Sequence, residues 1–126
     1  MDKALFEQGL QVRREVLGGE YVDAQIGQTD KFTKTIQELM TEYCWGAAWT
    51  RPGLDRKQRS LLNLGILIAL NRGTEFKTHV RGALTNGLTK DQIREIFMQV
   101  AIYAGVPAGV DAFRQAREVF AEQAKK

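Results

Sequence analysis

Hydrophobic residues recur at helical spacing along most of the chain. Apolar positions three, four and seven residues apart lie on one face of a helix. This spacing predicts six helices, over about 3–18, 29–50, 55–72, 74–86, 89–104 and 107–123. Residues 20–28 show no clear period, so we expect a loop there. No segment alternates between apolar and polar residues for more than a few positions, and the pattern therefore predicts an all-α fold.

Glycine, proline and capping residues mark the ends of these helices. Glycines 18, 73 and 87 each follow the last apolar position of a helix, where glycine commonly ends helical structure. Pro52 breaks the chain after the second helix, since proline has no N–H to donate. Asp55 with Gln58, and Thr89 with Gln92, have the spacing of capping boxes and predict two helix starts.

Two of the predicted helices have distinctive apolar faces. The second helix places Phe32, Ile36, Leu39, Met40 and Tyr43 at helical spacing, which predicts that this face packs in the core. Residues 61–70 are apolar on nearly every side. A helix of that kind is buried all round, either in the core or against another subunit.

Composition and charge narrow the class of protein. The length of 126 residues predicts one domain, residues 1–126. The net charge is +3, with basic and acidic residues interleaved, so we expect no nucleic-acid surface, while a small anionic substrate is compatible. The longest near-continuous apolar run, residues 61–70, spans ten residues and contains Asn63, whereas crossing a bilayer takes about 20. The first residues lack the apolar core of a signal peptide. We therefore expect a cytoplasmic protein without membrane contact.

The only histidine belongs to the first candidate site. Glu75 and His79 are four residues apart on a predicted helix and so share a face, and Arg72 joins them if the helix continues through Gly73. A carboxylate bound to an imidazole fixes its tautomer and tunes its acidity near neutrality, as a general acid or base requires. The alternative is an ordinary surface pair. With one histidine and one cysteine, Cys44, we expect no metal site and no disulfide.

A second candidate lies at the end of the second helix. Trp45 and Trp49 share a helix face and Arg51 follows them. Aromatic walls with one guanidinium suit a flat anionic ligand, although an aromatic core stripe has the same pattern. Arg59-Ser60 is a third candidate. A charge that enters a buried helix is usually paired, so Arg59 pairs either with a structural carboxylate such as Glu42 or with a substrate carboxylate.

Taken together, these residues resemble the carboxymuconolactone decarboxylase family, and within it the 4-carboxymuconolactone decarboxylases of aromatic-acid catabolism. The resemblance covers about residues 18–119. The family implies an all-α, six-helix alkylhydroperoxidase D-like fold with a central antiparallel helix pair, assembled as a homotrimer or homohexamer. The stretches that carry the resemblance are residues 19–23, 44–54, 59–61 and 69–72, Glu75 with His79 and Ala83, and residues 103–107.

The resemblance implies a lyase of the beta-ketoadipate pathway that converts 4-carboxymuconolactone, a small dicarboxylate lactone, into the 3-oxoadipate enol-lactone and CO₂. It implies no cofactor, because the unsaturated lactone is its own electron sink. On this basis His79, oriented by Glu75, is the expected general acid. Ser60 or His79 is the expected donor to the lactone oxygen. The remaining expected roles are carboxylate binding by Arg51 and Arg72, with Arg59 in reserve, and dry walls formed by Trp45 and Trp49.

Other readings stay open at this point. The alkylhydroperoxidase D branch of the superfamily has the pattern Glu-x11-Cys-x2-Cys-x3-His, and aligning its histidine with His79 puts Ser60, Arg72 and Glu75 at the other positions. Without a thiol pair, thiol peroxidase chemistry is disfavoured. A non-decarboxylating small-acid or lactone enzyme and a structural oligomer are the remaining alternatives. The Trp45–Leu54 segment, which a purely structural oligomer would not need, favours the decarboxylase.

Overall fold

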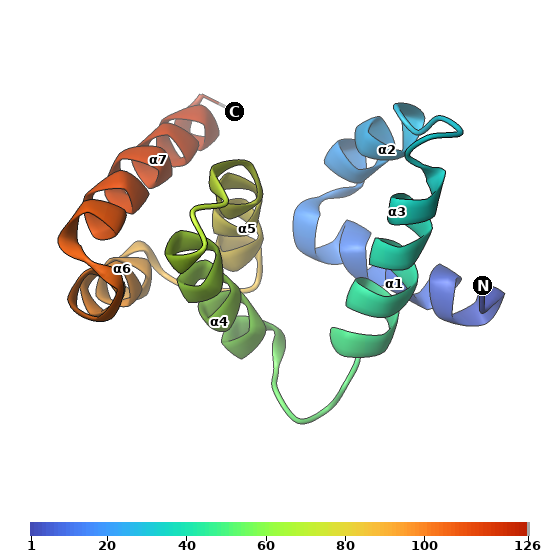
Figure 1. The fold of residues 1–126 in the computed structure, drawn as a ribbon, viewed down its shortest axis with the longest axis horizontal. Helices are drawn as coiled ribbons and strands as arrows, with labels where there is room; N and C mark the ends of the chain where they lie inside the picture. The colour runs from blue at the N-terminus through green and yellow to red at the C-terminus, as the bar shows by residue number, and fades with distance from the viewer. Residues whose placement is uncertain (126) are drawn as a thin grey trace. The chain divides into compact units, whose positions relative to one another are not determined.

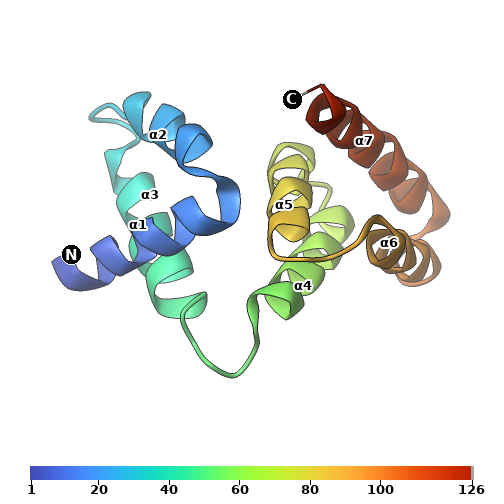
Figure 2. The ribbon, with the colours of Figure 1, turned by 180° about the vertical axis from the view of Figure 1, so that it is seen from behind.

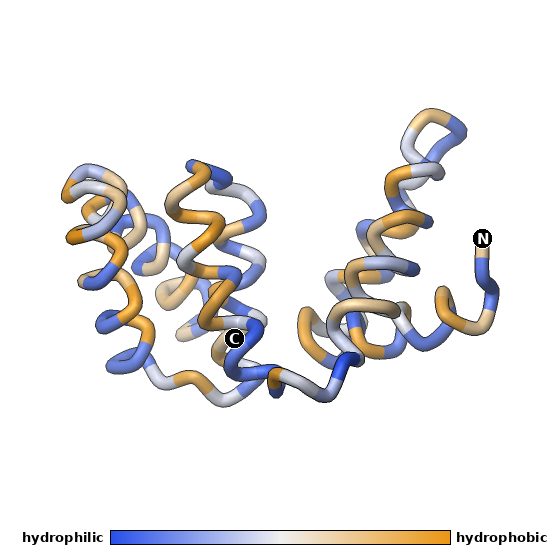
Figure 3. The backbone as a smooth tube through the Cα atoms, turned by 60° about the horizontal axis from the view of Figure 1, so that its bottom comes forward, coloured by the Kyte–Doolittle hydropathy of each residue, from blue (hydrophilic) through white to orange (hydrophobic). Residues whose placement is uncertain are grey.

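The computed structural model describes residues 1–125, and within them it contains helices and turns but no strand. This confirms the all-α prediction. The helices are α1 (Lys3–Leu17), α2 (Gly19–Gly27), α3 (Lys34–Leu39), the π-helix η1 (Met40–Ala48), α4 (Arg56–Ala69), α5 (Gly73–Thr85), α6 (Lys90–Ala104) and α7 (Val106–Ala124). Hydrophobic segments recur turn after turn along the helices, as amphipathic packing requires (Figure 3). No described helix is long and apolar enough to cross a membrane.

The chain folds into two compact units. Unit 1 is residues 1–55 and unit 2 is residues 56–126 (Figures 1 and 2). Unit 1 holds α1, α2, α3 and η1, and unit 2 holds α4 to α7. The expectation that residues 1–126 form a single domain stays a prediction.

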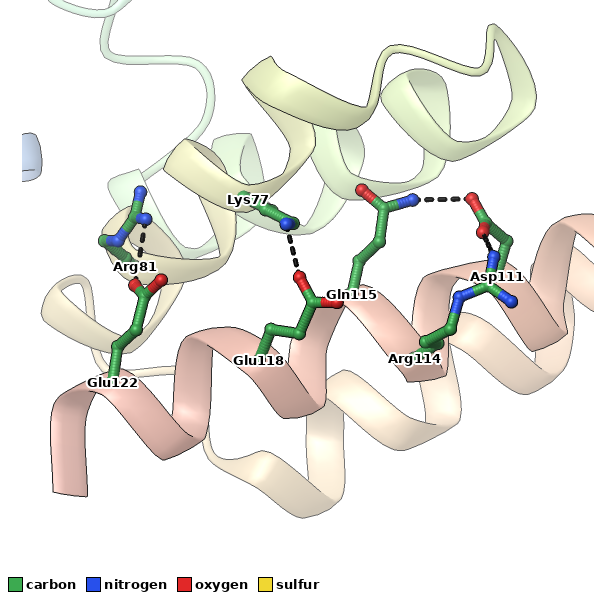
Figure 4. A network of polar contacts seen from close by, with 7 residues as sticks. All are labelled: Lys77, Arg81, Asp111, Arg114, Gln115, Glu118 and Glu122. Carbon is green, nitrogen blue, oxygen red and sulfur yellow. Dashed lines mark hydrogen bonds and ion pairs between the residues drawn. The ribbon is translucent and has the colours of Figure 1, made fainter.

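Unit 2 is a four-helix arrangement whose directions follow from its contacts. Asn86, after the end of α5, donates to Ser60 near the start of α4, so these two helices are antiparallel. Lys77 and Arg81 of α5 pair with residues 41 positions later on α7, so α5 and α7 run parallel (Figure 4). The core between them consists of buried apolar side chains, namely Leu64, Ile68, Phe76, Val80, Ala83, Leu88, Ile93, Phe97, Ala112, Ala116 and Val119.

Unit 1 has a smaller apolar cluster and an unusually close helix contact. Val12 and Val16 of α1 pack against Trp45 and Trp49. A Cβ added to Gly9 would collide with the carbonyl oxygen of Thr41 on η1, so the two backbones touch at this point. Glycine at this position is therefore what allows α1 and η1 to approach.

The expected loop at residues 20–28 is wrong, because α2 occupies Gly19–Gly27. Gly18 has a φ of +94°, which ends α1 and turns the chain directly into the next helix. In α2 Val22 is the one buried residue, so the sequence offers no repeating apolar positions to detect. The first turn of α2 is held instead by packing of Val22 and by the ion pair between Arg14 and Asp23.

The expected helix over 29–50 also differs from the structure. Asp30 accepts a hydrogen bond from the Thr33 N–H, and the regular helix α3 begins only at Lys34. From Met40 the helix continues with π geometry, which rotates the later side chains relative to an α-helix. The apolar face predicted for the core is largely exposed within this chain, with Phe32 at 91% exposure and Ile36, Leu39 and Tyr43 each at half or more. The buried face carries Thr41, Glu42, Trp45 and Trp49 instead.

Candidate functional site

The two units divide the predicted site residues between them. His79, Glu75, Arg72, Arg59 and Ser60 belong to unit 2. The tryptophan pair and Arg51 belong to unit 1. Among residues 1–125 no group of three or more His, Cys, Asp or Glu side chains is placed to hold a metal ion.

Glu75 and His79 lie one turn apart on α5, beside the buried Phe76 and Val80. Burial lowers the pKa of His79 to about 4, while the Glu75 carboxylate acts in the opposite direction and is the weaker influence. The expectation that this pair tunes the imidazole near neutrality is therefore wrong for the unliganded chain. The physical reason is that Glu75 is exposed to water and screened, whereas the imidazole is largely removed from water. Near pH 7 His79 is neutral.

Ser60 is fully buried and links two helices. Its Oγ accepts a hydrogen bond of 2.8 Å from Asn86 Nδ2, and the same amide donates to the Arg56 carbonyl at 3.3 Å. The neighbouring Arg59 is half-buried on α4. Asn86 was missed by sequence reasoning because its partners are 26 and 30 residues away, a contact that only the α4–α5 packing creates.

Arg72 lies at the start of α5 and lines a cavity of about 450 Å³. This cavity lies in unit 2 between the α4–α5 turn and α7. Asn71 has a φ of 59° there, a left-handed conformation that asparagine tolerates better than most residues. Neither Glu75 nor His79 lines this cavity. Of the three residues predicted to act together, only Arg72 does.

Two further polar residues of this cavity were missed. Asp111 and Gln115 lie one turn apart on α7, and the Gln115 Nε2 donates to the Asp111 carboxylate, which also pairs with Arg114 (Figure 4). A Cβ on Gly73 would lie 2.9 Å from Gln115 Oε1, so glycine makes room for this amide. Their i,i+4 spacing in the sequence predicts that they share a helix face. It does not predict that α7 lies beside the start of α5.

Trp45 and Trp49 stack with ring centroids 4.7 Å apart and an interplanar angle of 26°. Both are buried and pack against Val12 and Val16, which is the packing of an aromatic core stripe. Contact with a substrate stays a prediction for them. Arg51 follows the π-helix and is exposed.

Glu42, which sequence reasoning considered as a partner for Arg59, is buried in unit 1. Its Oε1 accepts a 2.9 Å hydrogen bond from the backbone N–H of Asp2 at the start of α1. Glu42 therefore helps to hold the first turn of the chain. Whether Arg59 binds a structural or a substrate carboxylate stays a prediction.

Comparison with known proteins adds a second kind of observation. The model of the carboxymuconolactone decarboxylase family matches residues 34–118, across both units. The chain is 46% identical over 112 residues to the nitrosuccinic acid decarboxylase of Metarhizium robertsii, which covers 89% of this chain and 78% of that protein. It is 40% identical over 119 residues to the 4-carboxymuconolactone decarboxylase of Acinetobacter baylyi, covering 94% of this chain and 89% of that protein.

Proposed function

This chain belongs to the carboxymuconolactone decarboxylase family, and on this premise we propose that it is a carboxy-lyase that decarboxylates 4-carboxymuconolactone to the 3-oxoadipate enol-lactone and CO₂ without a cofactor. The observation that carries the proposal is the 40% identity to a 4-carboxymuconolactone decarboxylase along 94% of the chain. The local arrangement on α5 adds to it, because a carboxylate and a histidine lie one turn apart there, near a guanidinium-lined cavity.

The reaction requires three roles of the protein. The carboxylate on the carbon next to the lactone oxygen leaves as CO₂, and its bonding electron pair moves through the ring double bond to the lactone carbonyl oxygen. The resulting dienolate then takes one proton on carbon. The protein must therefore hold the second carboxylate, stabilise negative charge on oxygen and deliver a proton.

Arginines hold the carboxylates in this proposal, since a guanidinium pairs with a carboxylate through two parallel hydrogen bonds. Arg72 is the best supported by structure, because it lines the 450 Å³ cavity of unit 2. Arg51 is exposed and Arg59 half-buried, and both stay in the proposal as the second and the reserve carboxylate ligand. Trp45 and Trp49 are the proposed dry walls for the departing carboxylate.

His79 is the proposed general acid, with Glu75 orienting its ring. The pKa of about 4 means that the free imidazole carries no proton to give at pH 7. A dianionic substrate favours the charged imidazolium, so we propose that His79 takes up a proton as the substrate binds and passes it to the dienolate carbon. Ser60 is the alternative donor toward the developing oxyanion. Its Oγ accepts a hydrogen bond from Asn86. The hydroxyl proton of Ser60 is therefore available to donate to the oxyanion.

Nitrosuccinic acid is a second candidate substrate, and the 46% identity to a nitrosuccinic acid decarboxylase favours it. Loss of CO₂ from the carbon that bears the nitro group sends the electron pair onto the nitro oxygens. The nitronate is then protonated on carbon. Both substrates are dicarboxylic acids with a built-in electron sink. Carboxylate binding, stabilisation of negative charge on oxygen and delivery of a proton are therefore sufficient for either.

The substrate is identified by direct assay of both acids with the purified chain. We expect CO₂ release, with loss of the ultraviolet absorbance of the lactone if 4-carboxymuconolactone is the substrate. The Acinetobacter baylyi enzyme serves as positive control. If that control turns over its lactone and this chain releases CO₂ from neither acid, the decarboxylase proposal is wrong, and a non-decarboxylating lactone or small-acid enzyme becomes the better proposal.

Variants of the site test the assigned roles. His79→Ala should lower kcat by about 10²-fold or more with a smaller change in KM, because it removes the proton donor. Glu75→Gln should lower kcat less, and Arg51→Ala or Arg72→Ala should mainly raise KM. Glu118→Gln, on the outer side of α7, is the control and should be unchanged. A near-normal kcat for His79→Ala would assign the proton to another group or to water.

The peroxidase alternative is tested through the cysteine. Cys44 is an exposed residue. Partial burial of its thiol raises the pKa of that group, which disfavours the thiolate. Cys44→Ser should keep most decarboxylase activity, and no peroxide reduction should be measurable in either form. Thiol-dependent peroxide turnover that this substitution abolishes would overturn the assignment.

We also propose that the chain assembles as a homotrimer or homohexamer, as the family resemblance implies. Leu61, Leu62 and Ile66 of α4 are each 43–51% exposed and line an apolar groove against α6. A second copy of this chain is the proposed occupant. Light scattering should show three or six chains at micromolar concentration, and a stable monomer there would contradict the proposal.

A further inference from the structure

Arg13 of α1 is a buried charge in the interior of unit 1. The residue is 3% exposed. Its Nη1 donates to Gln37 Oε1 at 3.0 Å and lies 3.4 Å from Thr41 Oγ1. These partners, from α3 and η1, are neutral, so the guanidinium is held in place without being neutralised.

No carboxylate among residues 1–125 forms a hydrogen bond or ion pair with Arg13. The titratable groups that interact with it are the Tyr21 phenol and the Cys44 thiol, and side chains of these types are ordinarily neutral near pH 7. Burial lowers the pKa of Arg13, which is the mark of a charge lacking compensation. The next residue, Arg14, differs because it is exposed and paired with Asp23. Buried charges in folded proteins are normally paired, so the surroundings of Arg13 lack an anion.

The unused side of the guanidinium has a specific shape. Both contacts come from Nη1, and Nε is buried with no acceptor in the described part of the chain. The Nε and Nη2 groups form one edge of the planar guanidinium, and their two parallel N–H donors match the two oxygens of a carboxylate. This edge, whose Nε has no acceptor, therefore matches a carboxylate better than a spherical anion.

We propose that Arg13 is the binding residue for a carboxylate group of a small organic acid, bound side-on at its Nε–Nη2 edge. The element that must move to admit the ligand is α3, which carries Gln37 and has no buried residue of its own. A helix with so little buried surface opens at low free energy. Binding adds the missing negative charge. Gln37 moves with α3, whereas Thr41 on η1 stays beside the guanidinium.

Thermal unfolding of the full chain with succinate tests this site. Succinate at about tenfold its Kd should raise the Tm of the wild type by about 4 °C, whereas succinamide, its uncharged analogue, should not at matched ionic strength. Arg13→Met should lose the succinate shift, and Arg14→Met, its exposed neighbour on the same helix, should keep it. Without ligand, Arg13→Met should be at least as stable as the wild type, since an uncompensated buried charge is replaced by an apolar side chain of similar length.

Arg13→Lys decides the matter should Arg13→Met fail to fold. Lysine keeps the charge but not the two-donor edge, so the succinate shift should fall by more than half. An equal succinate shift in the wild type, Arg13→Met and Arg13→Lys overturns the proposal. So does the absence of any difference between succinate and succinamide in the wild type, because the site would then have no preference for a carboxylate.

The origin of the carboxylate is distinguished by kinetics, and only this step rests on the proposed decarboxylase function. If the ligand is the substrate, Arg13→Lys raises KM for the acid that is turned over, and succinate inhibits competitively. If the ligand is a separate effector, KM is unchanged while the Arg13-dependent succinate shift remains. The unfolding result stands by itself, so failure of the decarboxylase proposal leaves the carboxylate site intact, and failure of the site leaves the decarboxylase proposal intact.

Discussion

Units 1 and 2 are stabilised in different ways. Unit 2 has an apolar cluster of eleven buried residues. Phe97 lies in it between Phe76 and Phe113, with ring centroids 5.5 and 5.3 Å away. Two of its ion pairs, Lys77–Glu118 and Arg81–Glu122, join α5 and α7 at the surface (Figure 4). Unit 1 has four residues in its apolar cluster and buries two charged residues, Arg13 and Glu42, beside them.

The difference indicates which part of the chain is specialised for stability and which is not. Burial of large apolar side chains is the dominant favourable term in folding, and unit 2 has most of it. A buried arginine without a counter-charge opposes folding, and unit 1 retains one. Functional sites are where proteins retain such unfavourable features. This contrast is what makes Arg13 a candidate for binding rather than for structure.

The largest expected effect contrasts the same substitution in the two units. Phe97→Ala in unit 2 should lower the free energy of unfolding by about 3–5 kcal/mol, because Phe97 is 1% exposed and its removal leaves a cavity. Phe32→Ala in unit 1 should change it by less than about 0.5 kcal/mol, since Phe32 is 91% exposed. Urea unfolding measures both. A loss at Phe32 as large as that at Phe97 would mean that an assembly covers the turn before α3.

Acid should destabilise unit 2 through His79. The folded pKa of about 4 is below the ordinary 6.5, so the unfolded chain binds more protons between these values and stability rises with pH across that window. The contribution is fully present above about pH 6.5 and is lost as the pH falls toward 4. It amounts to about 3 kcal/mol at most. Unfolding at several pH values should show that slope in the wild type and a shallower one in His79→Gln, and equal slopes would contradict the burial assigned to this imidazole.

Unit 1 should be sensitive to a single methyl group at its helix contact. Gly9→Ala should lower the free energy of unfolding by about 1–3 kcal/mol, because the new Cβ meets the backbone of η1. Gly27→Ala is the matched control, as nothing lies within 4 Å of its Cβ, and it should be neutral or stabilising by up to about 1 kcal/mol. Thermal unfolding of the two variants compares them directly. A neutral Gly9→Ala would show that α1 and η1 can separate at no cost.

The smallest expected effect is at the surface of unit 2. Lys77 pairs with Glu118 between α5 and α7, with both side chains partly exposed. A double-mutant cycle of Lys77→Met and Glu118→Gln should give a coupling energy of less than about 1 kcal/mol that falls as salt is added. A coupling of several kcal/mol, unaffected by salt, would mean that ion pairs rather than apolar burial hold α7 in place.

Helices were predicted correctly from the sequence where the helix itself carries a repeating apolar pattern. α1 and the Thr89–Gln92 capping box of α6 are confirmed, because cap, apolar face and terminating glycine are all local. α2 was missed since one buried residue, Val22, makes no period. The second expected helix had helical apolar spacing but was assigned the wrong buried face. Ile36 and Leu39 are exposed within this chain, because spacing places residues on a face without saying what packs against it.

The sequence by itself determined the all-α class, the family resemblance and the pairing of Glu75 with His79 on one helix, because each depends on residue types at short, fixed spacing. Tertiary structure decided what those residues experience. The desolvation of His79, the Asn86–Ser60 hydrogen bond and the isolation of Arg13 among neutral partners all come from residues distant in the sequence. The physical reason is that spacing places side chains on a face, whereas burial and charge balance depend on what packs against that face.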